Sequence, residues 1–80
     1  MKQFSTQKII DFSDAKDETM ISVTVGTGNL VIEVEDGSGW VVSDTLIYDY
    51  AGKMATYGAR MRFTPTGNCT YSIDTRGVAQ

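Results

Sequence analysis

The stretch that decides the fold is residues 21–35, ISVTVGTGNLVIEVE. On both sides of its central GTGN, every second residue is apolar, which is the period-two pattern of a strand with one buried face. Two glycines and an asparagine at residues 26–29 supply turn chemistry, because these residue types tolerate positive φ. Two alternating segments joined by such a turn predict a β-hairpin.

The rest of the chain extends this pattern. Of its 80 residues, 23 are the β-branched types Thr, Val and Ile, which suit a pleated surface better than a helix. Further strands are expected within residues 4–12, 40–42, 46–48, 53–57, 59–64 and 69–73, with turns at 36–39, 49–52 and 64–67. At most, residues 13–18 form one polar helical turn. We expect one domain over residues 1–80: an all-β, small antiparallel β-sandwich or jelly-roll-like barrel of seven to eight short strands.

One short motif occurs twice. Thr27-Gly28-Asn29 recurs 39 residues later as Thr66-Gly67-Asn68. The strand after each turn keeps the same apolar phase, whereas the phase before each turn differs by one residue. This predicts two similar turns, each followed by a similar strand, and does not establish a duplication.

The core is expected to be thin. Ile, Val, Leu and Phe make up 18 of 80 residues, just above the roughly 20% below which chains tend to stay disordered. Trp40 is expected at the centre of this core, and Cys69 is expected as a buried small apolar residue. A chain with one cysteine and no histidine has neither an intrachain disulfide nor a usual zinc site to stabilise it. Self-association or docking on a larger body is the expected source of further stability.

Enzymatic chemistry is not expected. Without histidine, Ser–His and Cys–His nucleophiles are excluded, and no glycine-rich phosphate loop opens a helix. The acidic run at residues 11–18 has neither the glycine nor the alternate spacing of a calcium loop. Glu33 and Glu35 share one strand face, which we expect to be the solvated one. We therefore predict no catalytic residue, no cofactor and no metal site.

The charge pattern argues against two classes of partner. The net charge is −3, and Arg60 with Arg62 is the densest basic pair, expected on a solvated strand face or in salt bridges. Nucleic acid is therefore not an expected partner. No apolar stretch approaches the roughly 20 residues of a membrane helix, and the N-terminus lacks the apolar segment of a secretory signal. We expect a soluble protein made in a cytoplasm, with no membrane partner.

The expected contact surface lies near the N-terminus. Phe4, Ile9, Ile10 and Phe12 do not alternate cleanly, and adjacent Ile9 and Ile10 place apolar groups on both strand faces. Residues 1–12 are therefore either an interface arm that pairs with a neighbour or an edge strand of the chain's own sandwich. Two further contact residues, Tyr50 and Tyr57, are expected in or beside turns.

Two segments, VEDGSGWV at residues 34–41 and RFTPTG at residues 62–67, resemble small virion proteins of tailed bacteriophages. This resemblance implies a β-sandwich that acts as a capsid decoration (cement) protein on the outer surface of a phage head. It also implies a homo-oligomer, possibly a trimer, that is made in the host cytoplasm and binds the major capsid protein or other virion proteins. A tail or fibre component is the alternative within this class. A carbohydrate-binding adhesion module that uses Trp40 and exposed tyrosines is the alternative from another class.

Overall fold

The computed structural model describes residues 1–13 and 17–76. Within them it contains strands and no helix, which confirms the all-β prediction. The strands are β1 (Lys2–Phe4), β2 (Lys8–Asp11), β3 (Glu18–Thr24), β4 (Leu30–Asp36), β5 (Gly39–Leu46), β6 (Tyr50–Ala55), β7 (Arg60–Pro65) and β8 (Thr70–Ile73). The helical turn predicted for residues 13–18 includes residues 14–16, which lie outside the described residues.

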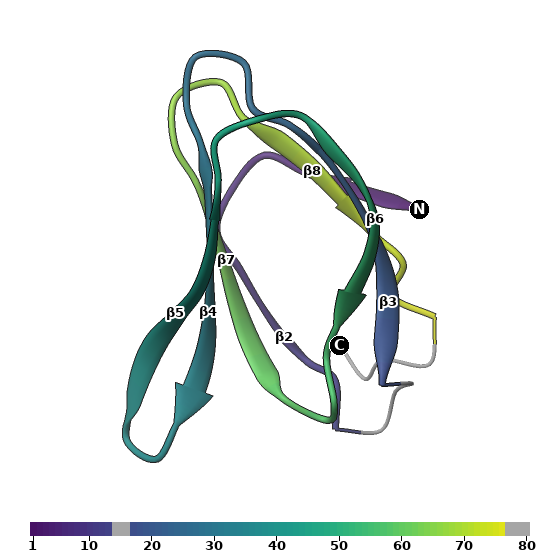
Figure 1. Cartoon of the computed structure of the whole chain (residues 1–80), viewed down its shortest axis with the longest axis vertical. Helices are drawn as coiled ribbons and strands as arrows, with labels where there is room; N and C mark the ends of the chain where they lie inside the picture. The colour runs from purple at the N-terminus through teal and green to yellow at the C-terminus, as the bar shows by residue number, and fades with distance from the viewer. Residues whose placement is uncertain (14–16, 77–80) are drawn as a thin grey trace.

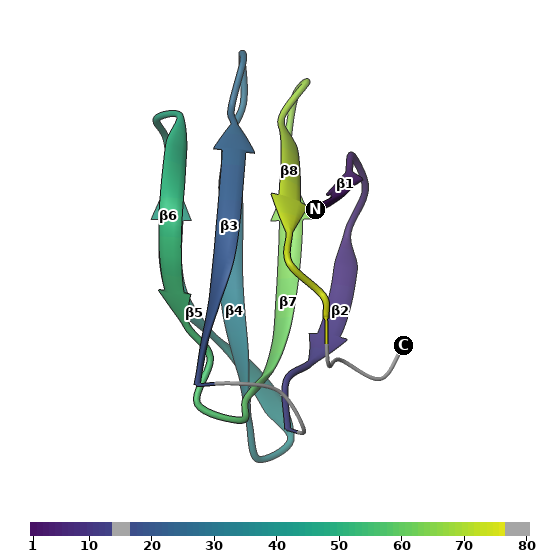
Figure 2. The ribbon, with the colours of Figure 1, turned by 90° about the vertical axis from the view of Figure 1, so that its right-hand side faces the viewer.

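Two antiparallel four-stranded sheets face each other, as predicted for a sandwich (Figures 1 and 2). One sheet has the order β1-β8-β3-β6 and the other β2-β7-β4-β5. The edge strands β1 and β2 lie on one side of the sandwich, and the edge strands β5 and β6 lie on the opposite side (Figure 2). Each sheet therefore has two free edges, and those edges differ in length and in charge.

The hairpin predicted for residues 21–35 is wrong. The turn after Val25 joins β3 to β4, but these strands belong to different sheets. β3 pairs with β8, with Val23 opposite Tyr71, and β4 pairs with β7, with Ile32 opposite Phe63. The connection is an arch between the layers, so the apolar faces of β3 and β4 meet across the core. Alternation identifies a buried face but does not specify the neighbouring strand.

The strand order has an internal two-fold relationship. If β1 to β4 are exchanged with β5 to β8 in order, the first sheet becomes β5-β4-β7-β2, which is the second sheet in reverse. The arches β3–β4 and β7–β8 correspond under this exchange, and they contain the two Thr-Gly-Asn motifs. They lie side by side at one end of the sandwich (Figures 1 and 2). The sequence repeat covers only one turn and one strand, whereas the two-fold relationship of the strand order covers all eight strands.

The core is built on Phe12, Phe63 and Tyr71, which are essentially inaccessible to solvent. The Phe63 and Tyr71 rings stack at 5.8 Å, and Phe12 meets Phe63 edge-on at 6.5 Å. Cys69 is buried, as predicted. The prediction that Trp40 lies at the centre of the core is wrong. Trp40 is half-buried, and its pairing with Glu35 places it on the outer face of its sheet.

Three predicted strands also have different boundaries. The first strand, expected over residues 4–12, is instead two short strands, β1 and β2, that belong to different sheets. β5 is one strand of eight residues, although two shorter strands were expected there. A bulge in its pairing with β4, between Ile32 and Glu33, lets β5 continue through the polar residues 43–45. Residues 50–52, predicted as part of a turn, begin β6 because they pair with β3. The actual connection between β5 and β6 is residues 47–49.

Candidate functional site

The side of the sandwich formed by β1 and β2 is closed. The Phe4 ring packs against the Tyr71 ring at a centroid distance of 5.4 Å. The Tyr71 hydroxyl donates a hydrogen bond of 2.7 Å to the Thr6 carbonyl, between β1 and β2. Burial raises the pKa of this hydroxyl, so it stays protonated and keeps its role as a donor. These contacts cover the core at this edge.

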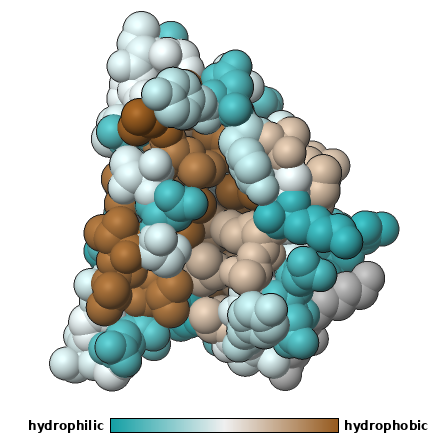
Figure 3. Space-filling model, in the orientation of Figure 1, coloured by the Kyte–Doolittle hydropathy of each residue, from teal (hydrophilic) through white to brown (hydrophobic). Residues whose placement is uncertain are grey.

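Exposed large apolar side chains concentrate on the opposite side. Five of them lie within residues 41–50: Val41, Val42, Ile47, Tyr48 and Tyr50. The others on the described chain are more widely spaced along the sequence. Figure 3 shows apolar side chains gathered over β5 and in the hollow beside it. A concentration of exposed apolar side chains is the kind of surface that marks an interaction site.

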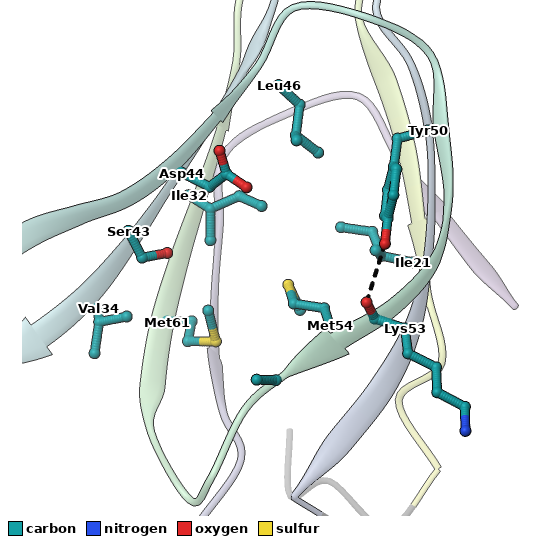
Figure 4. Close-up of a pocket in the computed structure, with 11 residues that line it drawn as sticks. Ile21, Ile32, Val34, Ser43, Asp44, Leu46, Tyr50, Lys53, Met54 and Met61 are labelled. Atoms are coloured by element: carbon teal, nitrogen blue, oxygen red, sulfur yellow. Dashed lines mark hydrogen bonds between the residues drawn. The ribbon is translucent and has the colours of Figure 1, made fainter.

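A groove of about 410 Å³ lies on this side, between β5 and β6. In Figure 4, side chains from both sheets point into it. Its apolar residues are Ile21, Ile32, Val34, Leu46, Met54 and Met61, and its rim contains Ser43, Asp44, Tyr50 and Lys53. The groove is therefore the core itself, reached from outside because β5 and β6 do not close over it.

Three local features shape this side of the sandwich. The hydroxyl of Tyr50 donates to the carbonyl of Lys53 at 3.1 Å, which aligns the ring along the rim. Gly52 leaves room for that ring, because a Cβ there would lie 2.7 Å from the tyrosine hydroxyl. The carboxylate of Asp49 accepts a hydrogen bond of 3.0 Å from the backbone N–H of Val25 and so anchors the connection between β5 and β6.

β5 is the least protected edge strand. It has eight residues, and Asp44 is its only charged side chain. The other edges are short or charged: β1 has three residues, β2 carries Lys8 and Asp11, and β6 carries Lys53. Proteins usually protect sheet edges with charge, proline or short strands, because free backbone groups pair with other chains. β5 lacks these protections over its first half.

The outer face of the same sheet is a paired charge network. Arg62 binds Glu33 through two hydrogen bonds of 2.9 Å, and Arg60 contacts Glu35 at 2.5 Å. The hydrogen bonds from Arg62 hold the pKa of the Glu33 carboxyl below its ordinary value. The Trp40 ring lies against both guanidinium groups, at 4.6 Å from Arg62 and 5.8 Å from Arg60. The predicted salt bridges of this basic pair are confirmed.

The structure distributes the six predicted contact residues over different environments. Ile10 and Phe12 belong to the chain's own core, and Phe4 packs against it. Ile9 is exposed on β2, and Tyr57 is exposed in the turn between β6 and β7. Only Tyr50 lies at the groove, so the structure does not bring the six together.

The residues that sequence interpretation missed are Val41, Val42, Ile47 and Tyr48. The signal was present, since Trp40-Val41-Val42 and Leu46-Ile47-Tyr48 place apolar groups on both faces of a strand. The same pattern at Ile9 and Ile10 predicts a contact surface there, at the opposite side of the sandwich.

The described residues give little support for a metal site, a membrane-spanning helix or a reactive cysteine. Among them, no group of three His, Cys, Asp or Glu side chains is placed to hold a metal ion. No helix in the described part of the chain is long and apolar enough to cross a membrane. Burial raises the pKa of the Cys69 thiol, which disfavours the reactive thiolate. The arrangement at the open side is suited to binding another macromolecule.

Comparison of the chain with known protein families, curated proteins and solved structures finds no match. The open side of the sandwich is therefore the observation on which a function has to rest.

Proposed function

We propose that this protein is a non-enzymatic structural component of a phage virion, a capsid decoration protein that binds the outer surface of the head. The observation that carries this proposal is the open side of the sandwich. There, a free edge strand, an apolar groove and five exposed apolar side chains occur together.

Covering the open side of the sandwich would bury apolar area. Burial of apolar surface contributes roughly 25 cal/mol per Å², so covering the groove and its exposed rim would add to a small core. A strand placed along β5, from the shell or from a second copy, would also satisfy backbone groups that its free edge leaves to water. Both effects favour a protein that completes its sandwich by docking on another chain.

The resemblance supports the class of partner. Its first segment, residues 34–41, covers the β4–β5 turn and the start of β5, directly beside the open side. Its second segment, residues 62–67, covers the end of β7 and the arch that follows. A tail or fibre component would use the same surface on a different part of the virion.

The carbohydrate-binding alternative has less support. The Trp40 ring is engaged by two arginines, and the two most exposed tyrosines lie in different connections. Tyr48 precedes β6 and Tyr57 follows it, so they stand at opposite ends of that strand. These residues therefore do not form one stacking platform for a sugar.

The test first locates the gene for this chain, which we expect in a phage genome, and then uses purified virions of that phage. A gene outside any phage genome would overturn the proposal. We expect mass spectrometry to detect the protein in virions and in tail-free heads, in many copies. Its presence in tails alone would support the tail alternative, and its absence from virions would overturn the proposal. Purified heads that lack the protein should bind it again on mixing.

The same binding assay locates the contact surface. We expect the double variant Ile47→Asp, Tyr48→Ser to bind heads at least about tenfold more weakly, because it places charge and polarity on the exposed connection between β5 and β6. The matched control is Tyr57→Ser, which changes an equally exposed tyrosine away from the groove. Equal binding by both variants would place the contact surface elsewhere.

A further inference from the structure

The first half of β5 has the properties of a strand that pairs with its own copy. Residues 39–43 carry no charge, and Val41 and Val42 are each more than half exposed. Uncharged, exposed edge strands are the usual sites of pairing between chains. A second copy is a partner of matching chemistry, because the same uncharged strand is then present on both sides.

Symmetry limits the possible registers. In an antiparallel pair with a two-fold axis through one residue, that residue lies opposite itself, and residues equally spaced on either side lie opposite each other. With Val41 on the axis, Trp40 of each copy lies opposite Val42 of the other, so this pair occurs twice. Both residues lie on the outer face, because Trp40 pairs with Glu35 and Val42 with Glu33. Pairs of an aromatic and a β-branched residue are favourable across strands.

Charge selects among these registers. An axis through Asp44 would place two carboxylates opposite each other, which is destabilising. An axis through Val42 would place Trp40 opposite Asp44 of the second copy. With the axis through Val41, Asp44 lies opposite Ser38, beyond the start of the partner strand. An axis through Trp40 would place Asp44 opposite Asp36 of the second copy, again two carboxylates. Of these four axes, the one through Val41 keeps Asp44 outside the paired segment and away from a second carboxylate.

The bulge limits the length of this pairing. The register of β5 shifts opposite Ile32 and Glu33, and a bulge ends regular pairing at the same point on the free edge. The extra residue of the bulge is Ser43, because Val42 pairs with Glu33 and Asp44 with Ile32. The regularly paired segment is therefore residues 40–42 of each copy. A contact this short belongs to the class of small, weak interfaces. It would become effective where many copies are held close together, as on a shell.

From these observations we infer that two copies of the chain associate through antiparallel pairing of their β5 strands about an axis at Val41, which joins two four-stranded sheets into one of eight strands. This deepens the proposed function, because it assigns the β5 edge to a second copy. The groove and the 47–49 connection remain for the shell. The expected assembly is a dimer; the trimer implied by the resemblance is a different outcome.

The first experiment measures self-association of the full chain by sedimentation from micromolar to millimolar concentration. We expect a monomer–dimer equilibrium, and a dissociation constant at least about tenfold higher for Val41→Lys. The matched control is Ile9→Lys, which adds the same charge to an exposed residue on the other edge strand of that sheet. It should dimerise like the wild type.

The second experiment tests the register. Because Val41 would face itself across the axis, Val41→Cys should form a covalent dimer under mild oxidation. Ile9→Cys, also at an exposed position but on the opposite edge of that sheet, should stay monomeric. The native Cys69 is buried and should not interfere. Equal cross-linking of both variants would indicate random encounter and would overturn the register.

The outcomes separate this inference from the proposed function. A chain that is monomeric at every concentration, or trimeric, overturns β5 self-pairing, even if it still binds purified heads. A chain that dimerises through Val41 but is absent from virions overturns the virion proposal and leaves the pairing intact.

Discussion

The side-chain amide oxygen of Asn68 accepts two hydrogen bonds from Thr27, one of 2.7 Å from its backbone N–H and one of 3.0 Å from its hydroxyl. A reciprocal contact joins Thr66 of the second arch to Asn29 of the first. The hydroxyl of Thr66 accepts from the backbone N–H of Asn29 at 3.0 Å and donates to its side-chain oxygen at 2.9 Å. The two Thr-Gly-Asn motifs therefore hold each other, and they fix the two sheets at this end of the sandwich (Figure 1).

The first prediction tests this pair of turns. Asn68→Ala removes the acceptor of both bonds from Thr27, and we expect it to lower the free energy of unfolding by about 1–2 kcal/mol. Urea denaturation measures the change. Asn68→Asp keeps an oxygen at the same place, so it should retain more stability than Asn68→Ala. Equal stability of the wild type and Asn68→Ala would show that the turns hold together without this side chain.

The second prediction concerns the close approach of the two arches. A Cβ on Gly28 would lie 1.8 Å from the carbonyl oxygen of Thr66, which is backbone and cannot move freely. We expect Gly28→Ala to cost about 3 kcal/mol or to prevent folding. Gly39→Ala is the control, since nothing lies within 4 Å of its Cβ position. Thermal unfolding that ranks the two variants equally would contradict the arch packing.

The sequence predicted which residues are buried better than which strands are neighbours. Leu30 and Ile32 are in the core, as their alternation indicates, and Glu33 and Glu35 are on the outer face. The predicted pairing of β4 with β3 is wrong, because an arch and a hairpin use the same turn residues and the same alternation. What separates them is packing between distant strands, which a local pattern does not contain.

Trp40 shows why the candidate site was also misplaced. Size alone suggested a core residue, but its pairing opposite Glu35 places it on the outer face against the guanidinium of Arg62. Apolar residues on both faces of a strand favour a cover on each face, although Ile9 on β2 is exposed. They do not say whether the cover comes from the same chain. Ile10 is covered by its own core, whereas Val41 and Val42 are not.

The third prediction is a dependence of stability on alkaline pH. Burial raises the pKa of Tyr71 above its ordinary value, so the folded chain holds this proton more tightly than the unfolded chain does. Its contribution to stability is therefore complete below about pH 10, the ordinary tyrosine pKa, and is lost as pH rises above it. Urea midpoints measured between neutral pH and pH 11 should fall for the wild type.

The matched variant for this prediction is Tyr71→Phe. It removes the hydroxyl that donates to Thr6, so we expect it to be less stable by about 1–2 kcal/mol at neutral pH. Its urea midpoint should then fall less steeply above pH 10 than that of the wild type. Parallel curves for the two proteins would mean that Tyr71 does not contribute to the alkaline loss.

The last prediction separates the two interpretations of the N-terminal segment. β1 and β2 pair with β8 and β7 of the same chain, and the Phe4 ring covers Tyr71. Deleting residues 1–6 removes this ring and the Thr6 carbonyl, and we expect a loss of about 2–3 kcal/mol from partial burial and one hydrogen bond. Ile9→Ser, an exposed change on β2, should stay within about 0.5 kcal/mol. A deletion that leaves the urea midpoint unchanged while abolishing head binding would instead make residues 1–12 a docking arm.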